Sequence, residues 1–309
     1  MKKRLLLIIF LAIIFSSCAE EFSPIYPLRA DAPKLNPDGF ISSGYYLLQD
    51  DEKGEWTYID NKLFINIRRF QDVVERQRKL VWYESELKLA DGQKLVTRHA
   101  NPEKIGRRFV YAEEFAKDIK AIFAISDDFY GFRVYQKRRP GVIIQNSKIL
   151  ADNTLSKPDY RLPNYDLIAL YKDGSLKTYH AGEIGAEQLL ADGATDTWCF
   201  GPILLSNGEI DEQVAANGFE YINPRMCLGM IEPNHYLVIT VEGRSKRSHG
   251  VGLMWVAQRM KDLGCIEALN LDGGNSIKLA FMGKLINANN TKLTKNRSVT
   301  SMITLGEFD

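Results

Sequence analysis

The sequence lacks an excess of either charge. Its 309 residues include 40 basic and 39 acidic side chains, which gives a formal net charge of +1. Proteins that bind nucleic acid usually carry a basic excess or a basic stripe, and the chain has no long block of like charge. The balance therefore argues against nucleic acid as a partner.

Motifs for metal-dependent and serine-nucleophile chemistry are also missing. The four histidines show no metal-ligand spacing, and the chain has neither H-E-x-x-H nor C-x-x-C. It has no G-x-S-x-G elbow and no P-loop. We therefore expect no cofactor and no metal site, with a divalent cation left open.

The first residues read as a targeting segment. Three basic residues, Lys2–Arg4, precede the apolar run Leu5–Phe15, which is too short for a membrane span of about 20 residues. Ser16 and Ser17 follow, and then Cys18, in an arrangement that resembles a bacterial lipobox. The alternative is an ordinary cleaved signal peptide with a coincidental cysteine. We predict a signal peptide over 1–17, a lipid on Cys18, and a membrane-anchored place in the cell envelope, on the periplasmic face or the cell surface.

The rest of the chain divides by pattern. Residues 18–79 begin with a Pro- and Asp-rich stretch of little periodicity, which predicts a tether followed by a segment that is hard to assign. Residues 80–309 have clearer signals and form the expected functional domain. Cys199, Cys227 and Cys265 have apolar neighbours, so buried thiols and a disulfide between two of them both stay open.

Hairpin signals recur in this domain. Short apolar runs are followed by turn residues at Asn146-Ser147, at Asp173-Gly174, at Asn207-Gly208 and near Gly283. Apolar runs beside Asn-Gly or Asp-Gly are strong hairpin signals, so frequent antiparallel pairing is expected.

One unit differs from the hairpins. The apolar strand 236–241 is followed by helical spacing over 250–263, by Gly264 as a C-terminal cap, and by a second apolar strand at 266–271. This predicts a β-α-β unit near the C-terminus. The fold class is therefore α+β, with a mixed, largely antiparallel sheet and flanking helices.

The most informative segment follows the second strand of that unit. It reads Asn-Leu-Asp-Gly-Gly-Asn-Ser over 270–276, with Asp272 at the strand end. The two glycines permit a sharp turn and close approach of a ligand. Taken alone, the pattern is also that of a tight turn.

Charged residues follow the neighbouring strand ends. Glu242 and Arg244 come just after the first strand of the unit, so parallel strands would bring Glu242 to the same sheet edge as Asp272. Paired carboxylates are the usual equipment of glycoside cleavage. Ser248 is expected to cap the helix, whose N-terminus would favour an anion. Arg225 begins another apolar strand beside this edge, and a surface ion pair is the plain alternative for a single Arg.

Taken together, these segments resemble the phosphodiester glycosidase family. The resemblance runs from about Trp82 to the C-terminus and is strongest between Trp198 and Ser276. It includes Phe129-Tyr130 and the Arg297-Ser298-Val299 strand, while Glu242 replaces the family's usual Asp and Asn275 its usual Gly. The resemblance implies an exported hydrolase that cleaves a sugar from a phosphodiester in a glycan or glycoconjugate.

Roles for individual residues follow from the motifs and the resemblance together. The expected catalytic residues are Asp272, Glu242, Arg244 and Arg225. The expected substrate-binding residues are Asp127, Asp128, Ser248, Asn270, Gly273, Gly274, Asn275, Ser276 and Arg297. Two other functions stay open: hydrolysis of a non-phosphorylated glycan, and an inactive carbohydrate-binding lipoprotein on the same scaffold.

Overall fold

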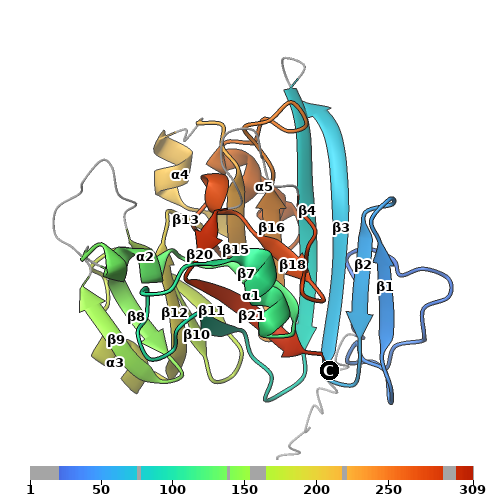
Figure 1. Ribbon diagram of the computed structural model, residues 1–309, viewed down its shortest axis with the longest axis horizontal. Helices are drawn as coiled ribbons and strands as arrows, with labels where there is room; N and C mark the ends of the chain where they lie inside the picture. Colours follow the sequence, from blue (N-terminus) through green and yellow to red (C-terminus); the bar gives the residue numbers. More distant parts are fainter. Residues whose placement is uncertain are drawn as a thin grey trace, which may run out of the picture.

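A computed structural model describes residues 21–74, 78–137, 140–153, 165–217, 221–287 and 297–308. Its strands form one large sheet, two smaller sheets and two short ribbons (Figure 1). The predicted signal peptide and Cys18 lie outside the described residues. None of the helices in those ranges combines the length and apolar character needed to cross a bilayer.

The large sheet has nine strands, each antiparallel to its neighbours. Their spatial order is β1 (Tyr46–Asp50), β2 (Glu55–Ile59), β3 (Leu63–Val74), β4 (Arg78–Leu89), β16 (His235–Val241), β15 (Arg225–Glu232), β17 (Glu267–Asn270), β13 (Ile203–Ser206) and β14 (Glu209–Ile210). In Figure 1, β1–β4 lie on one side of the molecule, and β8–β12 lie on the other.

The smaller sheets and the helices complete the fold. A five-stranded sheet has the order β19 (Lys284–Leu285), β18 (Leu279–Phe281), β7 (Ala121–Ser126), β21 (Ser301–Glu307) and β5 (Val96–His99). A three-stranded sheet has the order β11 (Leu176–Tyr179), β10 (Asp166–Tyr171) and β12 (Ala194–Phe200). The ribbons pair β20 (Ser298–Val299) with β6 (Val110–Tyr111) and β8 (Gly141–Gln145) with β9 (Lys148–Asn153). The helices are α1 (Ala112–Asp118), α2 (Tyr130–Tyr135), α3 (Ala186–Ala191), α4 (Glu212–Asn217) and α5 (Leu253–Asp262).

The predicted β-α-β unit is present, with β16 and β17 as its strands and α5 as its crossover. Both strands pair antiparallel with β15, which lies between them, so they run parallel to each other without being hydrogen-bonded to each other. Gly264, at φ +87°, follows the last turn of α5. The expected α+β class with largely antiparallel sheets is confirmed, as are the four hairpins β8–β9, β10–β11, β13–β14 and β18–β19.

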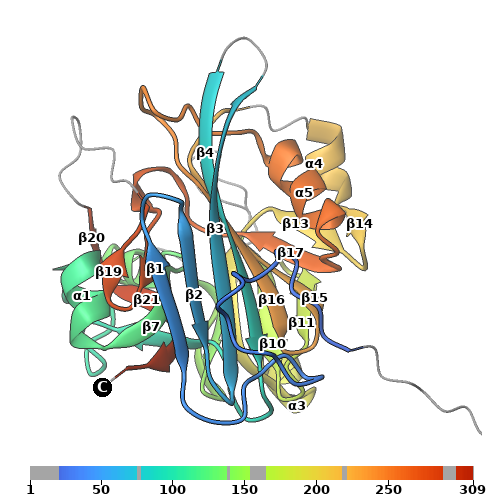
Figure 2. The same cartoon turned by 90° about the vertical axis from the view of Figure 1, so that its right-hand side faces the viewer.

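Alternation along β16 explains how the layers assemble. Leu237, Ile239 and Val241 pack under α5, which buries residues at helical spacing on its inner face. Tyr236 and Val238 point to the opposite face, where they join the core beneath the five-stranded sheet. The large sheet is thus covered by a helix on one face and by strands on the other. Figure 2 shows α4 and α5 together beside β13, on one side of this sheet.

The N-terminal segment belongs to the same fold. β3 pairs with β4 along twelve residues, so the large sheet continues across the boundary expected at residue 80. Phe22 packs on Phe64 with ring centroids 5.0 Å apart, and the backbone N–H of Ile25 donates to Glu86 (2.9 Å). The described part of the segment expected to be a tether is therefore packed against β3 and β4. These contacts come from single residues spaced along an irregular chain, so periodicity in the sequence does not reveal them.

Candidate functional site

The candidate site lies where two sheets meet. β17 ends at Asn270 in the nine-stranded sheet, and the chain then crosses to β18, which begins at Leu279 in the five-stranded sheet. β7 ends beside the start of β18, because the Ser126 N–H donates to the Lys278 carbonyl (2.9 Å) and the Lys278 N–H donates to Ser126 Oγ (3.1 Å). The crossing segment therefore places Asp272 near the end of β7.

A cavity of about 160 Å³ occupies this junction. Its polar lining comes from the end of β7, from the turn after β17 and from the segment before β21, and aromatic side chains close its remaining wall. The lining residues are Phe109, Ser126, Asp127, Phe129, Phe132, Asp272, Ser276, Arg297, Ser298, Val299 and Thr300. Expected site residues from three separate segments thus converge on one cavity: Asp127, Asp272 with Ser276, and Arg297.

Asp272 is the carboxylate at the end of β17. Its removal from solvent raises the pKa to about 6, although a hydrogen bond from Ser276 and the charge of Arg297 oppose the rise. Arg297 Nη1 in turn donates to Ser276 Oγ (3.1 Å). Asp272 is therefore held in a defined position, and it is mostly ionised at neutral pH.

Asp127 is the second carboxyl group in the cavity. Burial and the neighbouring charge of Asp128 raise its pKa to about 7, against hydrogen bonds from Ser301 and from the backbone N–H of Phe129. A carboxyl group that titrates near neutral pH is suited to proton transfer. Phe129 itself has φ +68°, a left-handed conformation that is uncommon outside glycine, and its N–H donates to Asp127 Oδ1 (3.0 Å).

Asp128 serves a different purpose from its neighbour. Its Oδ1 accepts from the backbone N–H of Tyr130 (3.0 Å), and its Oδ2 accepts from the backbone N–H of Cys199 on β12 (2.7 Å). Arg133, also buried, lies 3.4 Å from the same Oδ2. Asp128 thus ties the end of β7 to the three-stranded sheet and is not among the cavity residues.

Gly273 and Gly274 are required by close contacts of the turn with Pro224 and Arg244. A Cβ on Gly273 would lie 2.7 Å from the carbonyl oxygen of Pro224, and the N–H of Gly274 donates to that same oxygen (3.0 Å). Gly274 has φ +62°, and a Cβ there would lie 3.3 Å from Nη1 of Arg244. The turn is therefore pinned to Pro224 on one side and covered by Arg244 on the other.

Glu242 lies at the same sheet edge as Asp272 but outside the cavity. Its Oε1 accepts from the hydroxyl of Tyr83 (3.0 Å), and its Oε2 lies 3.2 Å from Nε of Arg247. The side chain is 1% exposed. The structure thus brings Asp127 to Asp272 in one cavity, where the sequence paired Asp272 with Glu242.

Arg225 and Arg244 lie beside the turn. Arg225 Nε donates to the Val251 carbonyl (3.2 Å). The pKa of Arg225 is lowered, mainly by burial and to a smaller extent by the positive charge of Arg244. Arg244, with φ +58°, is exposed and donates to Asn223 Oδ1 (2.8 Å). In the part of the chain that the structure describes, neither side chain forms an ion pair with a carboxylate.

Two expected binding residues have structural contacts. Ser248 was expected to cap the following helix, but α5 is capped by Gly252 and begins at Leu253. Ser248 Oγ instead donates to the carbonyl of Glu242 (2.6 Å) and accepts from the N–H of Val81 (3.1 Å). Asn270 is buried and donates to the carbonyl of Gly201 (2.7 Å). The helix N-terminus is therefore set back from the position that the sequence suggested.

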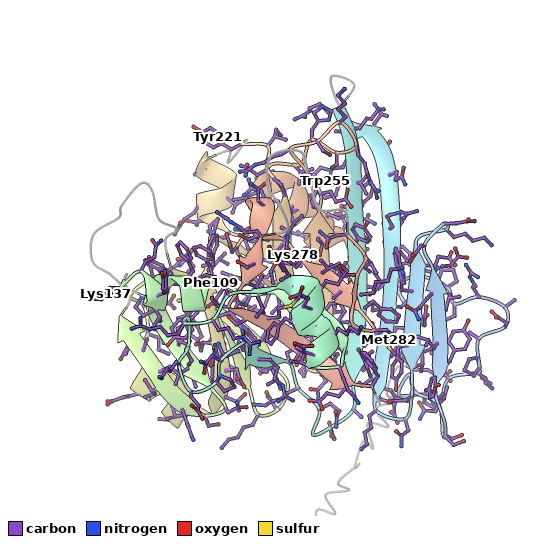
Figure 3. All side chains as sticks on the ribbon, viewed as in Figure 1. Phe109, Lys137, Tyr221, Trp255, Lys278 and Met282 are labelled. Carbon is purple, nitrogen blue, oxygen red and sulfur yellow. The ribbon has the colours of Figure 1, made fainter. Side chains whose placement is uncertain are left out.

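The remaining expected residue, Asn275, lies in the turn, and its carbonyl accepts from Lys278 Nζ (3.3 Å). Lys278 is 2% exposed, and burial together with Arg297 lowers its pKa to about 8. Figure 3 shows Lys278 over the middle of the molecule, away from the periphery where Tyr221 lies.

Sequence reasoning missed several residues around the cavity. Lys278 had a readable signal, because it interrupts the apolar run 277–281 and a buried lysine needs a reason. Ser301 donates to Asp127, but a serine at a strand start has no distinguishing pattern. Phe109, in an irregular segment, and Phe132, in the short helix α2, have ring centroids 6.5 Å apart, and no sequence pattern joins these two segments. In the described ranges, no group of three or more His, Cys, Asp or Glu side chains is arranged to hold a metal ion.

The similarity to known proteins covers the part of the chain that contains most of the cavity residues. The sequence profile of phosphodiester glycosidases matches residues 120–305. A Bacillus subtilis (strain 168) protein, the SPbeta prophage-derived uncharacterized protein YomE, is 31% identical over 143 residues, which are 45% of this chain. The chain spans 22% of that relative's length.

Solved structures share the fold. The catalytic domain of zebrafish N-acetylglucosamine-1-phosphodiester alpha-N-acetylglucosaminidase, auto-inhibited by its pro-peptide, superposes with a TM-score of 0.60 at 17% identity, over 80% of this chain and 84% of that one. A protein from Burkholderia pseudomallei K96243 described as exported has a TM-score of 0.50 at 13% identity, over 76% of this chain and 75% of that one.

Proposed function

The chain belongs to the phosphodiester glycosidase family, and from this premise we propose that it hydrolyses the bond between a sugar and a phosphodiester. The observation that carries the proposal is the convergence of Asp272, Asp127 and Arg297 on one cavity. Two carboxyl groups with a guanidinium beside them suit a substrate that is a glycoside and an anion at once.

The leaving group decides what the site has to supply. Cleavage at the anomeric carbon expels a phosphomonoester, whose second pKa is about 6, so the bond breaks without a strong general acid. The attacking water, by contrast, must lose a proton. Charge must also be stabilised on the sugar, which becomes oxocarbenium-like, and on the departing phosphate.

The two carboxyl groups divide these tasks. Asp272 has the lower pKa, about 6, and supplies the negative charge that stabilises the oxocarbenium-like sugar. Asp127 has the higher pKa, about 7, and takes the proton from water, because a base is most effective when its pKa is close to the working pH. Ser276 and Ser301 hold the two carboxylates in place.

The phosphate is bound by arginine. Arg297 lines the cavity and already donates to Ser276, which places a charged donor beside Asp272. Arg244 covers Gly274 on the other side of the turn and can offer a bidentate fork to phosphate oxygens. The stacked rings of Phe129 and Phe132, with centroids 4.3 Å apart, leave an apolar wall for the less polar face of the sugar.

We also propose that the enzyme works outside the cytoplasm, anchored through Cys18 in the cell envelope. The support is the basic segment, apolar run and Ser-Ser-Cys order at the N-terminus. Its substrate would then be a glycan or glycoconjugate of the envelope.

A substrate panel tests the proposed function. The soluble form from Ala19 onward is assayed against pairs of glycosides that share a sugar, one linked to a phosphodiester and the other to a neutral alcohol. We expect hydrolysis of at least one phosphodiester and a much lower rate on its neutral partner. Arg297→Gln should reduce this preference, because the guanidinium beside Asp272 is lost.

Arg98→Gln is the matched control. Arg98 pairs with Glu307 on the surface, and both side chains are well exposed, so its loss should leave the preference unchanged. Turnover of neutral glycosides with no phosphodiester cleaved would refute the proposal in favour of a plain glycosidase. No turnover of either class by a folded protein would instead indicate a binding lipoprotein.

A further inference from the structure

We propose that the loop 243–249, together with Lys79, binds phosphate groups of a polymer whose units are joined by phosphodiesters, and so guides that polymer to the cavity. The inference rests on the proposed function and adds the substrate class: a polyanionic chain in place of a small isolated glycoside. The loop and Lys79 are called the basic rim below.

The basic rim concentrates positive charge in a chain that is almost neutral. The loop contributes Arg244, Lys246 and Arg247, and all three are exposed. Lys79 is exposed at the start of β4, where its carbonyl accepts from the backbone N–H of His249 (2.9 Å). Arg247 is paired with Glu242, and the remaining charges of Lys79, Arg244 and Lys246 are a local excess in a chain whose net charge is only +1.

Hydrogen bonds hold the backbone of the loop, which fixes the points from which its charged side chains extend. The N–H of Ser245 donates to the carbonyl of Ser248 (2.9 Å), and the N–H of Arg244 donates to that of His249 (3.2 Å). Ser248 Oγ bonds both Glu242 and Val81, which fastens the loop to β4. This anchoring accounts for a buried serine that caps no helix.

The rim is continuous with the cavity. Arg244 lies over Gly274, two residues from both Asp272 and Ser276 in the cavity wall. Arg244 has a left-handed backbone (φ +58°), and Lys246 and Arg247 follow it in the same exposed loop. A substrate with one phosphate would use Arg297 and Arg244 alone. The cations beyond Arg244 fit further phosphates on the same chain.

Multiple phosphate contacts have a measurable signature. Binding to a flexible polyanion releases counterions, so the logarithm of the binding constant falls linearly with the logarithm of the salt concentration. For a single nucleic-acid strand the slope is about 0.7 per neutralised phosphate, and we take this value for the polymer. The tested variant is Lys79→Ala with Lys246→Ala, since neither lysine forms an ion pair in the described ranges or belongs to the catalytic machinery. Arg247 is left intact because it pairs with buried Glu242.

A matched control removes the same charge near the opposite end of β4. Lys62 precedes β3 at the end where Leu63 pairs with Leu89, and Lys172 lies in the β10–β11 turn beside Asn234. Both are exposed. The control variant is Lys62→Ala with Lys172→Ala.

The experiment measures binding of labelled poly(glycerol phosphate) to the soluble chain at several salt concentrations. We expect the rim variant to bind more weakly, with a salt slope lower by about 1.4, and the control variant to bind like wild type. Equal binding by wild type and the rim variant, or equal losses in both variants, overturns the proposal. So does rim-dependent binding to phosphatidylglycerol vesicles without binding to the polymer, which would make the rim a membrane contact.

Turnover separates this inference from the proposed function. On a small glycosyl phosphodiester, the rim variant should keep the wild-type kcat and KM, while its KM for a glycosylated polymer should rise. If wild type cleaves no small phosphodiester, the proposed function fails, and the polymer-binding result still decides the role of the rim.

Discussion

The pH dependence of kcat/KM tests the assignment of the two carboxyl groups. The proposed mechanism needs Asp272 and Asp127 both ionised, with pKa values of about 6 and about 7. From these values the doubly ionised fraction is about 0.9 at pH 8, about 0.05 at pH 6 and about 0.001 at pH 5. The rate should therefore rise roughly twentyfold between pH 6 and pH 8 and then level off.

The shape of the profile distinguishes base from acid. If Asp127 donated a proton to the leaving group, kcat/KM would fall above pH 7 and the profile would be a bell. A plateau from pH 8 to pH 9 supports the base role, and a bell refutes it. Asp127→Asn should slow turnover by about 10²–10⁴-fold and leave a single ionisation near pH 6, that of Asp272.

Thermal unfolding gives an independent check on the pKa of Asp127. Because this pKa is raised in the folded protein, the folded state keeps a proton that the unfolded state releases above about pH 4. Asp127 therefore costs stability as pH rises toward 7. The Tm of Asp127→Asn, relative to wild type, should be higher at pH 8 than at pH 5. A difference that does not change with pH would contradict the raised pKa.

Four further predictions concern the turn, the arginine beside it and the anchor. Asp272→Asn should lower kcat by about 10²–10⁴-fold, since Asn keeps the size of Asp but not its charge; near-wild-type turnover would reduce Asp272 to a turn residue. Gly273→Ala should destabilise the fold by about 1–3 kcal/mol in urea unfolding, because the added Cβ would lie 2.7 Å from the Pro224 carbonyl; Gly185→Ala, at a similar negative φ and with no atom closer than 3.6 Å to the added Cβ, is the control and should cost less. Arg244→Lys should raise KM for phosphodiesters more than for neutral glycosides, because the bidentate fork is lost, and equal changes for both classes would place Arg244 outside the phosphate site. Cys18→Ser should move the full-length protein from membrane to soluble fractions; unchanged partitioning would exclude lipidation at Cys18.

Local signals were enough for much of the fold. The four hairpins and the β-α-β unit are encoded by turn residues and by periodicity within about 30 residues, so each could be predicted from its own segment. The segment before residue 80 could not. β3 is buried along its first half, Leu63–Arg68, and so has no alternation, and the chain before β1 packs through scattered contacts such as Phe22 on Phe64.

The candidate site could be predicted from the sequence only in part. Strand order along one sheet edge placed Arg225, Glu242 and Asp272 together, and the register of β15 with β16 and β17 agrees with that placement. The partner of Asp272 in the cavity, Asp127, comes from the end of β7 in another sheet. No pattern within one sheet predicts how two sheets meet.

The direction in which the Glu242 side chain points could not be predicted from the sequence either. Glu242 follows a fully buried strand at the right edge, but its carboxylate contacts Tyr83 and Arg247. Those partners come from β4 and from the loop that follows Glu242 itself. An irregular stretch separates Ser248 from α5, and the sequence did not define its length. The cap of α5 is therefore Gly252, four residues after the predicted Ser248.

The path of the chain between the sheets links stability to catalysis. Residues 271–278 leave one sheet and enter another, so the position of Asp272 depends on both, and the contact of Gly273 with Pro224 fixes the turn at its middle. Pro224 also precedes Arg225, at the start of β15 between the two parallel strands. A change that loosens this contact should therefore displace Asp272 relative to Asp127 before it unfolds either sheet. The two glycines are thus better explained by the need to hold two carboxyl groups in one cavity than by flexibility for an incoming ligand.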